Sequence, residues 1–206
     1  MKKFFLLFCI SFCGMSVFSQ GQIPDALILY RDGKFAESIA VCEDELRETP
    51  DRIESYIVMC WSLVGNKQYS QAEIRATEAL KLAPSDIRVI EVLGEAKYYL
   101  GKNNGAMEQF QKYVANAKPS APRLGSAFYF MGEIYIKQGR YQHADISFTS
   151  ACRQDPTIDR WWVRLGYARK MAGNYRESYT AYEEALRLNP ASQEAKAGME
   201  EVGKKF

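Results

Sequence analysis

The sequence is poor in the residues that build most catalytic and metal sites. It has one histidine, His143, and five cysteines, none of them in a Cys-x-x-Cys spacing. A general base beside a nucleophile is therefore not indicated, and neither is a zinc site. Adjacent carboxylates such as Glu183 and Glu184 point to different faces of a helix and form no catalytic pair. The sequence predicts no enzyme activity, no catalytic residue, no cofactor and no metal.

The chain also lacks an excess of one charge sign. Its formal net charge is +2, and Lys2 and Lys3 account for it, so the remaining chain balances. Because nucleic-acid binders need a basic face, no nucleic-acid partner is expected. No stretch alternates with a period of two, which excludes half-buried strands and favours an all-α fold.

The first nineteen residues differ in composition from the remainder. Two lysines precede an apolar run from Phe4 to Phe18, which is short for a bilayer that needs about 20 apolar residues. We expect a signal peptide at 1–19, cleaved after Ser19, and an exported, periplasmic or secreted protein. An uncleaved anchor and a lipid on Cys13 are the alternatives, although Phe12 is bulkier than a lipidation site usually has. Membrane contact is expected only in those two cases.

Similar segments recur about every 34 residues. Residues 138–156, QGRYQHADISFTSACRQDP, match residues 172–190, AGNYRESYTAYEEALRLNP, at glycine, aromatic, alanine and proline positions. Such a period indicates a repeat architecture. The expected units are 19–52, 53–86, 87–120, 125–158 and 159–192. Each unit has two apolar stripes of helical spacing, the first ended by glycine and the second by proline.

The segment LGYARKMAGNYRESYTAYEEALRLNP resembles the tetratricopeptide repeat, with its Leu-Gly, Gly-x-Tyr, alanines and closing proline. The resemblance covers residues 19–192 and implies a right-handed superhelical solenoid of about five helix-turn-helix repeats. Residues 193–206 resemble the capping helix that ends such arrays. The buried aromatic residues are then expected to be Tyr56, Phe128, Phe148, Trp162, Tyr175 and Tyr182.

The resemblance also implies a concave groove, lined by the first helix of each repeat, that holds a peptide or a partner's helix. The candidate partner-binding residues are Tyr30, Ile57, Trp61, Arg88, Glu91, Glu95, Tyr98, Tyr99, Tyr129, Glu133, Lys137, Arg160, Arg164, Tyr167 and Lys170. This set is rich in the residue types that anchor interfaces. Its charge is expected to be sorted, acidic around Glu91, Glu95 and Glu133 and basic from Lys137 to Lys170.

Two details of the array are left open by the sequence. Cys42, Cys60 and Cys152 are expected in the core, either as free thiols or with a bridge between Cys42 and Cys60. Residues 121–124 interrupt the period, and they form either a hinge between the third and fourth repeats or a longer loop with an early helix start near Pro122.

The predicted function is that of a non-catalytic adaptor or scaffold in the cell envelope or secreted space, which binds a protein or extended peptide. The alternatives are an assembly factor similar to tetratricopeptide lipoproteins of outer-membrane or pilus machines and, less favoured, a small-ligand carrier or enzyme. Self-association through end helices is a further option. The lysine and asparagine clamp that some family members use for chaperone tails is not indicated, because its positions hold residues such as Ile57 and Trp61.

Overall fold

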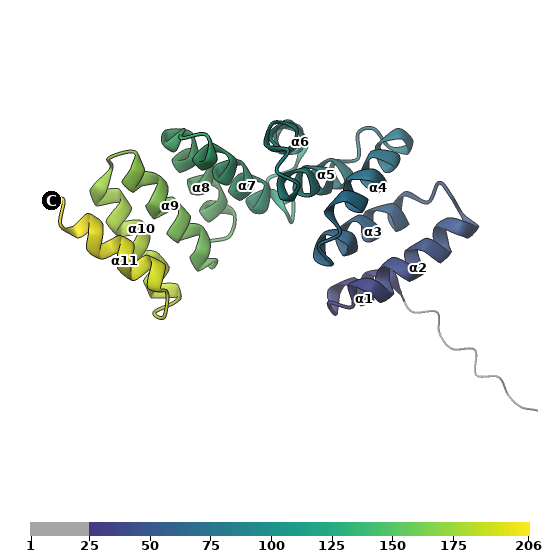
Figure 1. The fold of residues 1–206 in the computed structure, drawn as a ribbon, viewed down its shortest axis with the longest axis horizontal. Helices are drawn as coiled ribbons and strands as arrows, with labels where there is room; N and C mark the ends of the chain where they lie inside the picture. The colour runs from purple at the N-terminus through teal and green to yellow at the C-terminus, as the bar shows by residue number, and fades with distance from the viewer. Residues whose placement is uncertain (1–24) are drawn as a thin grey trace, which may run out of the picture.

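The computed structural model describes residues 25–206, which form eleven helices (Figure 1). They are α1 (Ala26–Arg31), α2 (Phe35–Glu48), α3 (Ile53–Gly65), α4 (Tyr69–Leu82), α5 (Ile87–Tyr99), α6 (Asn103–Asn116), α7 (Leu124–Lys137), α8 (Tyr141–Gln154), α9 (Asp159–Met171), α10 (Tyr175–Leu188) and α11 (Gln193–Gly203). The predicted all-α fold is confirmed. One helix pair corresponds to each of the five ranges expected for a repeat, although α7 begins one residue before its range, and α11 follows the last pair.

The turn inside each repeat depends on one backbone position. Gly33, Gly101, Gly139 and Gly173 adopt positive φ angles between 68° and 83° where the first helix ends. Glycine reaches this region without steric cost. In the second repeat the same position holds Lys67, with φ of 60°. The repeat geometry therefore persists where the sequence departs from the glycine pattern.

The helices form two layers. Among the odd-numbered helices, α1 contacts α3, α3 contacts α5, α5 contacts α7, and α9 contacts α11, in addition to the contacts between sequence neighbours. Figure 1 shows the pairs following one another along the long axis, from α1 at one end to α11 at the other. We call the exposed and half-buried side of α1, α3, α5, α7 and α9 the inner surface.

Small residues let the two helices of a pair approach closely. In the fifth repeat, the Ser178 hydroxyl donates a hydrogen bond to the carbonyl oxygen of Gly166 at 2.7 Å. A Cβ atom at Gly166 would lie 2.8 Å from the ring of Tyr182. Gly94 and Gly132 meet the rings of Phe110 and Phe148 in the same way. The repeat pattern is therefore a packing pattern, in which an aromatic ring covers a glycine.

The expected aromatic core is only partly correct. Phe148 and Tyr182 are buried, whereas Tyr56, Phe128, Trp162 and Tyr175 are half-buried. In the fifth repeat the buried indole is that of Trp161, which covers Gly125. The Trp162 indole instead reaches the preceding turn, where its Nε1–H donates to the carbonyl oxygen of Pro156 at 2.9 Å.

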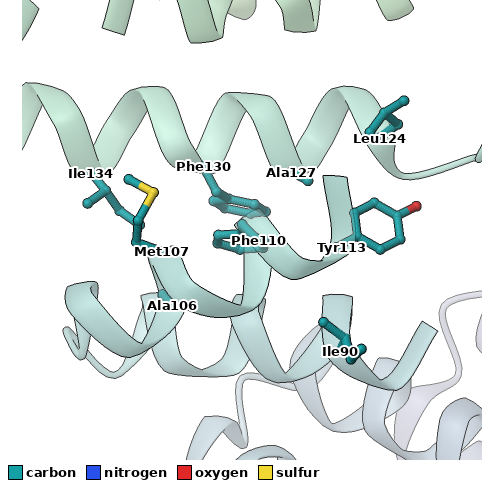
Figure 2. Packing of buried hydrophobic residues seen from close by; sticks show 9 residues of the cluster. All are labelled: Ile90, Ala106, Met107, Phe110, Tyr113, Leu124, Ala127, Phe130 and Ile134. Carbon is teal, nitrogen blue, oxygen red and sulfur yellow. The ribbon is translucent and has the colours of Figure 1, made fainter. Parts of the chain in front are cut away.

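The interruption of the period does not interrupt the core. Residues 121–124, which interrupt the period, are called the insertion below. Helix α7 begins at Leu124, so the insertion lengthens the loop before it, and the helix does not start as early as Pro122. Beneath the loop, the rings of Phe110 and Phe130 stack with centroids 5.4 Å apart and an interplanar angle of 8°. Figure 2 shows this pair between α6 and α7, with Ala127 and Ile134 beside it. The third and fourth repeats thus share one hydrophobic cluster.

The three cysteines within the described residues are buried free thiols. Burial raises the pKa of Cys42, Cys60 and Cys152 to about 12, so they are protonated at neutral pH. They are core residues, and Cys42 and Cys60 form no bridge. No helix between residues 25 and 206 is long and apolar enough to cross a membrane. The expected signal peptide at 1–19 lies outside the described residues.

Candidate partner-binding surface

The fold places most of the predicted groove residues on the inner surface. Those that are half-buried or exposed are Tyr30, Trp61, Arg88, Tyr98, Tyr99, Tyr129, Glu133, Lys137, Arg160, Arg164, Tyr167 and Lys170. Three of the predicted residues, Ile57, Glu91 and Glu95, are buried instead. The expectation that a partner can reach these three directly is wrong, for two different reasons.

Ile57 belongs to the core between the second and third repeats. Its side chain is 1% exposed and lies in a cluster with Cys60, Ala76 and Val89. An isoleucine in this position contributes apolar area to the contact between neighbouring repeats. Ile57 thus stabilises the helices that form the inner surface but does not lie on that surface.

Glu91 and Glu95 are covered by Arg123, which comes from the insertion. The two carboxylates lie one helical turn apart on α5. Arg123 Nε lies 2.7 Å from Glu91 Oε2, and the other end of the guanidinium contacts Glu95. The ion pairs of Arg123 with these two carboxylates therefore hold the insertion against α5 on the inner surface. Sequence reasoning did not identify Arg123 as part of the site.

Burial changes the ionisation of this cluster. It raises the pKa of Glu91 to about 7, and the nearby charge of Arg123 only partly opposes this. Burial also raises the pKa of Glu95. For Arg123, burial favours the neutral form, but the two carboxylates outweigh it and raise its pKa. Arg123 stays charged, while Glu91 exchanges its proton near neutral pH.

Other charges of the inner surface are paired from one repeat to the next. Arg88 contacts Glu54 at 2.8 Å, and Lys170 contacts Glu201 at 2.8 Å. Arg164 donates two hydrogen bonds to the carboxylate of Glu133, at 2.5 and 3.1 Å. The predicted acidic region is therefore wrong, because Glu91, Glu95 and Glu133 are all paired with arginines.

Two predicted cations remain without a carboxylate partner. Within residues 25–206, no carboxylate oxygen lies within 4.0 Å of Lys137 or Arg160. Lys137 Nζ lies 4.1 Å from the centre of the Tyr98 ring, and the Arg160 guanidinium lies 5.0 Å from that of Tyr129. Such cation–π contacts position a charge while leaving it free to bind an anion.

Lys137 and Arg160 form a patch with exposed aromatic area. Tyr99 is 45% exposed and stacks on Tyr69 at 4.5 Å, and its ring also meets that of Tyr98. Burial raises the pKa of Tyr98 and Tyr129 to about 12, so both phenols are neutral. We call Tyr98, Tyr99, Tyr129, Lys137 and Arg160 the cation–aromatic patch. It spans three successive repeats, and its two positive charges lie on the fourth and fifth.

The part of the inner surface formed by the first three repeats contains two cavities. A cavity of about 340 Å³ lies between α1, α3, α5 and the insertion, and a neighbouring one of about 310 Å³ shares Tyr30, Trp61 and Arg123 with it. The larger cavity is lined by Leu27, Tyr30, Arg31, Trp61, Ile87, Arg88, Glu91, Tyr113, Ala121, Pro122 and Arg123. Sequence reasoning missed Tyr113 and the insertion residues, because they lie outside the groove positions expected from the repeat. Leu27 lies at the repeat position of Trp61 but was not among the predicted partner-binding residues.

The single histidine of the chain lies outside the inner surface. His143 is exposed on α8, where its ring lies 5.2 Å from that of Tyr135. Within the described part of the chain, no group of three His, Cys, Asp or Glu residues could hold a metal ion.

Comparison with known proteins identifies the repeats. The family model "Tetratricopeptide repeat" matches residues 125–158 and residues 160–192. The chain is 20% identical over 178 residues to anaphase-promoting complex subunit 7 of Arabidopsis thaliana. It is 25% identical over 158 residues to subunit 3 of that complex from Schizosaccharomyces pombe. These matches cover 86% and 74% of this chain but only 31% and 22% of the relatives, so the chain spans a minor part of each.

Solved structures share the fold. The crystal structure of MamA superimposes with a TM-score of 0.67 at 17% identity, covering 88% of this chain and 97% of MamA. The structure of YrrB, described as a TPR protein with an unusual peptide-binding site, gives 0.66 at 17% identity and covers 88% and 89%. That of a thermophilic TPR protein from Thermus thermophilus gives 0.63 at 17% identity and covers 87% and 95%. With its helix pairs, its glycine and aromatic packing and these matches, the chain is a tetratricopeptide repeat protein.

Proposed function

We propose that the protein is a non-catalytic scaffold that binds an extended segment of a partner protein along its inner surface. The observation that carries the proposal is the cation–aromatic patch, whose two cations lack an internal partner while Arg88, Arg164 and Lys170 of the same surface are paired with carboxylates. Exposed aromatic rings with arginine are typical of interface anchors. The peptide-binding site named for YrrB lies on the same kind of fold and supports the proposal.

The charge of the patch indicates which partner segment fits. Lys137 and Arg160 would pair with carboxylates, and the rings of Tyr99 and Tyr129 would pack against apolar or aromatic side chains next to them. A segment that alternates acidic and apolar residues is complementary to this arrangement. Such a partner should associate faster at low salt, because exposed charges are screened within about 10 Å at ~0.1 M salt.

We also propose that the protein works outside the cytoplasm, in the cell envelope or secreted space. The support is the sequence of its first nineteen residues, with a basic start followed by a short apolar run. The balanced charge of the remaining chain suits a protein partner better than a nucleic acid.

Removing the patch is expected to abolish partner binding without unfolding the chain. The variant Tyr99→Ala/Tyr129→Ala/Arg160→Ala removes two aromatic anchors and one free cation. We expect it to lose at least tenfold in affinity, since truncation of one anchor typically costs about 2 kcal/mol. The measurement is quantitative capture of proteins from the producing cell by the wild-type chain and by the variant, with circular dichroism to verify folding.

The matched control is Ile74→Ala/Ile146→Ala, which removes two exposed apolar side chains from α4 and α8 in the other layer. It should capture the same partner as the wild-type chain. Equal capture by the patch variant would refute the proposal. Loss of capture in the control would show that the layer of α4 and α8 carries the contact, and it would refute the proposal as well.

A further inference from the structure

The larger cavity of the inner surface is lined mostly by apolar side chains. The rings of Tyr30 and Trp61 lie 5.8 Å apart at an angle of 31°. Both side chains are half-buried, as are those of Leu27 and Ile87, so a partner can reach part of each. Tyr113 is 3% exposed and adds a third ring. With a volume of about 340 Å³, in the range of ligand pockets, the cavity is suited to one large apolar side chain.

Three guanidinium groups also line the cavity, and one of them is free to bind a partner. Arg88 and Arg123 each contact two carboxylates. Arg31 is exposed in the last turn of α1, where it lines both neighbouring cavities. Within residues 25–206, no carboxylate oxygen lies within 4.0 Å of Arg31. The Glu91 carboxylate is 0% exposed and contacts Arg123, so the unpaired charge that a partner meets at this cavity is that of Arg31.

The free charges of the cation–aromatic patch have the same sign. Lys137 and Arg160 lack a carboxylate partner, whereas Glu54 and Glu133 are paired with arginines. A partner segment therefore meets unpaired cations in the first repeat as well as in the fourth and fifth. Acidic residues of the segment are complementary to these cations, and basic residues would be repelled by them.

We propose that this cavity binds an aromatic side chain of the partner segment and that Arg31 pairs with an acidic side chain next to it. This contact rests on the proposed function, because it is a second anchor for the same segment. The aromatic ring would lie against those of Tyr30 and Trp61 in an edge-to-face or offset arrangement, which aromatic pairs prefer. The Arg31 guanidinium would donate charge-assisted hydrogen bonds to the carboxylate at the rim. The cavity thus selects for an aromatic residue beside an acidic one.

Blocked dipeptides test the cavity without the partner. Acetyl-Phe-Asp-amide carries both groups, acetyl-Phe-Asn-amide lacks the charge, and acetyl-Ala-Asp-amide lacks the ring. Each would be titrated into the full chain while the three indole N–H signals are followed by NMR. The Trp61 signal reports on the cavity. The Trp161 signal reports on the cation–aromatic patch, because its ring stacks on that of Tyr129 at 6.0 Å. The variants Trp61→Phe and Trp161→Phe assign the two signals.

We expect acetyl-Phe-Asp-amide to shift the Trp61 signal in a saturable way. Acetyl-Ala-Asp-amide should bind at least tenfold more weakly, because the ring supplies most of the apolar area that the cavity can bury. Acetyl-Phe-Asn-amide should bind about threefold more weakly, as is typical for the loss of an exposed ion pair. In Arg31→Gln the probes with Asp and Asn should bind equally well.

Arg47→Gln is the matched control, since it removes an exposed arginine of α2 that does not line the cavity. That variant should keep the threefold preference for the probe with Asp. Both substitutions lie at exposed positions, so both variants are expected to fold.

A Trp61 signal that no probe shifts would overturn the inference, and so would equal affinities of the probes with and without the ring. A shift of Trp161 alone would place the probe on the patch and overturn it as well. A preference for Asp that survives Arg31→Gln would refute the role of Arg31. Because the probes need no partner, loss of the proposed function in the capture experiment and failure of the cavity to bind are separate results.

Discussion

Arg123→Met is expected to lose about 3 kcal/mol of unfolding free energy at about pH 8, and much less at about pH 5. The substitution leaves Glu91 and Glu95 buried without their common cation. Breaking a buried ion pair by removing one partner is costly, because the remaining charge is desolvated and uncompensated. The loss is largest where both carboxylates would be ionised.

The sign of the pH dependence follows from the pKa of Glu91. Its pKa is about 7 in the folded chain, above the ordinary value of 4.5. Between these two values the folded chain binds more protons than the unfolded chain, so this group's contribution to stability falls as the pH rises. Without Arg123 the folded pKa moves further up, which widens the window in which acid restores stability.

Urea unfolding of wild type and variant at both pH values measures the effect. Arg160→Met is the control, since Arg160 has no carboxylate partner and should change the unfolding free energy by less than about 0.5 kcal/mol. An equal loss at both pH values would mean that the stem of Arg123 matters by packing alone. No loss at either pH would contradict the view that Arg123 fastens the insertion.

Phe110→Ala is expected to cost about 4 kcal/mol and to separate unfolding into two transitions. The Phe110 ring is 0% exposed, covers Gly94 and stacks on Phe130 across the boundary between the third and fourth repeats. In a repeat protein, stability depends on contacts between neighbours. A cavity at this boundary therefore weakens the coupling between the two parts of the array.

Denaturant unfolding followed by circular dichroism and by tryptophan fluorescence tests this expectation. The two probes should give one common midpoint in the wild-type chain and different midpoints in Phe110→Ala. Ile146→Ala, with a side chain that is 68% exposed, should leave the common midpoint unchanged. One shared transition in Phe110→Ala would mean that the coupling lies elsewhere in the boundary.

The repeat register could be predicted from the sequence because it depends on local rules. A glycine with positive φ ends the first helix of four repeats, as at Gly173, and an aromatic ring such as Tyr182 covers a glycine of the paired helix. These positions recur every 34 residues except across the four-residue insertion, so they are visible without coordinates. The departure at Lys67 was visible too, because the residues around it keep the pattern.

The inner surface could be predicted only in part, because the ion pairs on it join residues that are far apart in the sequence. Glu133 meets Arg164, 31 residues away, and Glu91 meets Arg123 from a loop that follows no repeat rule. One signal for Arg123 was present in the sequence. Glu91 and Glu95 are the two acidic residues in the largely apolar run from Val89 to Ala96, and carboxylates on such a helix need a cation nearby.

The most direct test of the proposed scaffold function is site-specific photocrosslinking in the producing cell. A photoreactive amino acid would replace Tyr99, 45% exposed on the inner surface, or Ile146, 68% exposed on α8. Our account predicts a crosslinked partner from position 99, identified by mass spectrometry, and none from position 146. A partner crosslinked from position 146 and not from position 99 would contradict it.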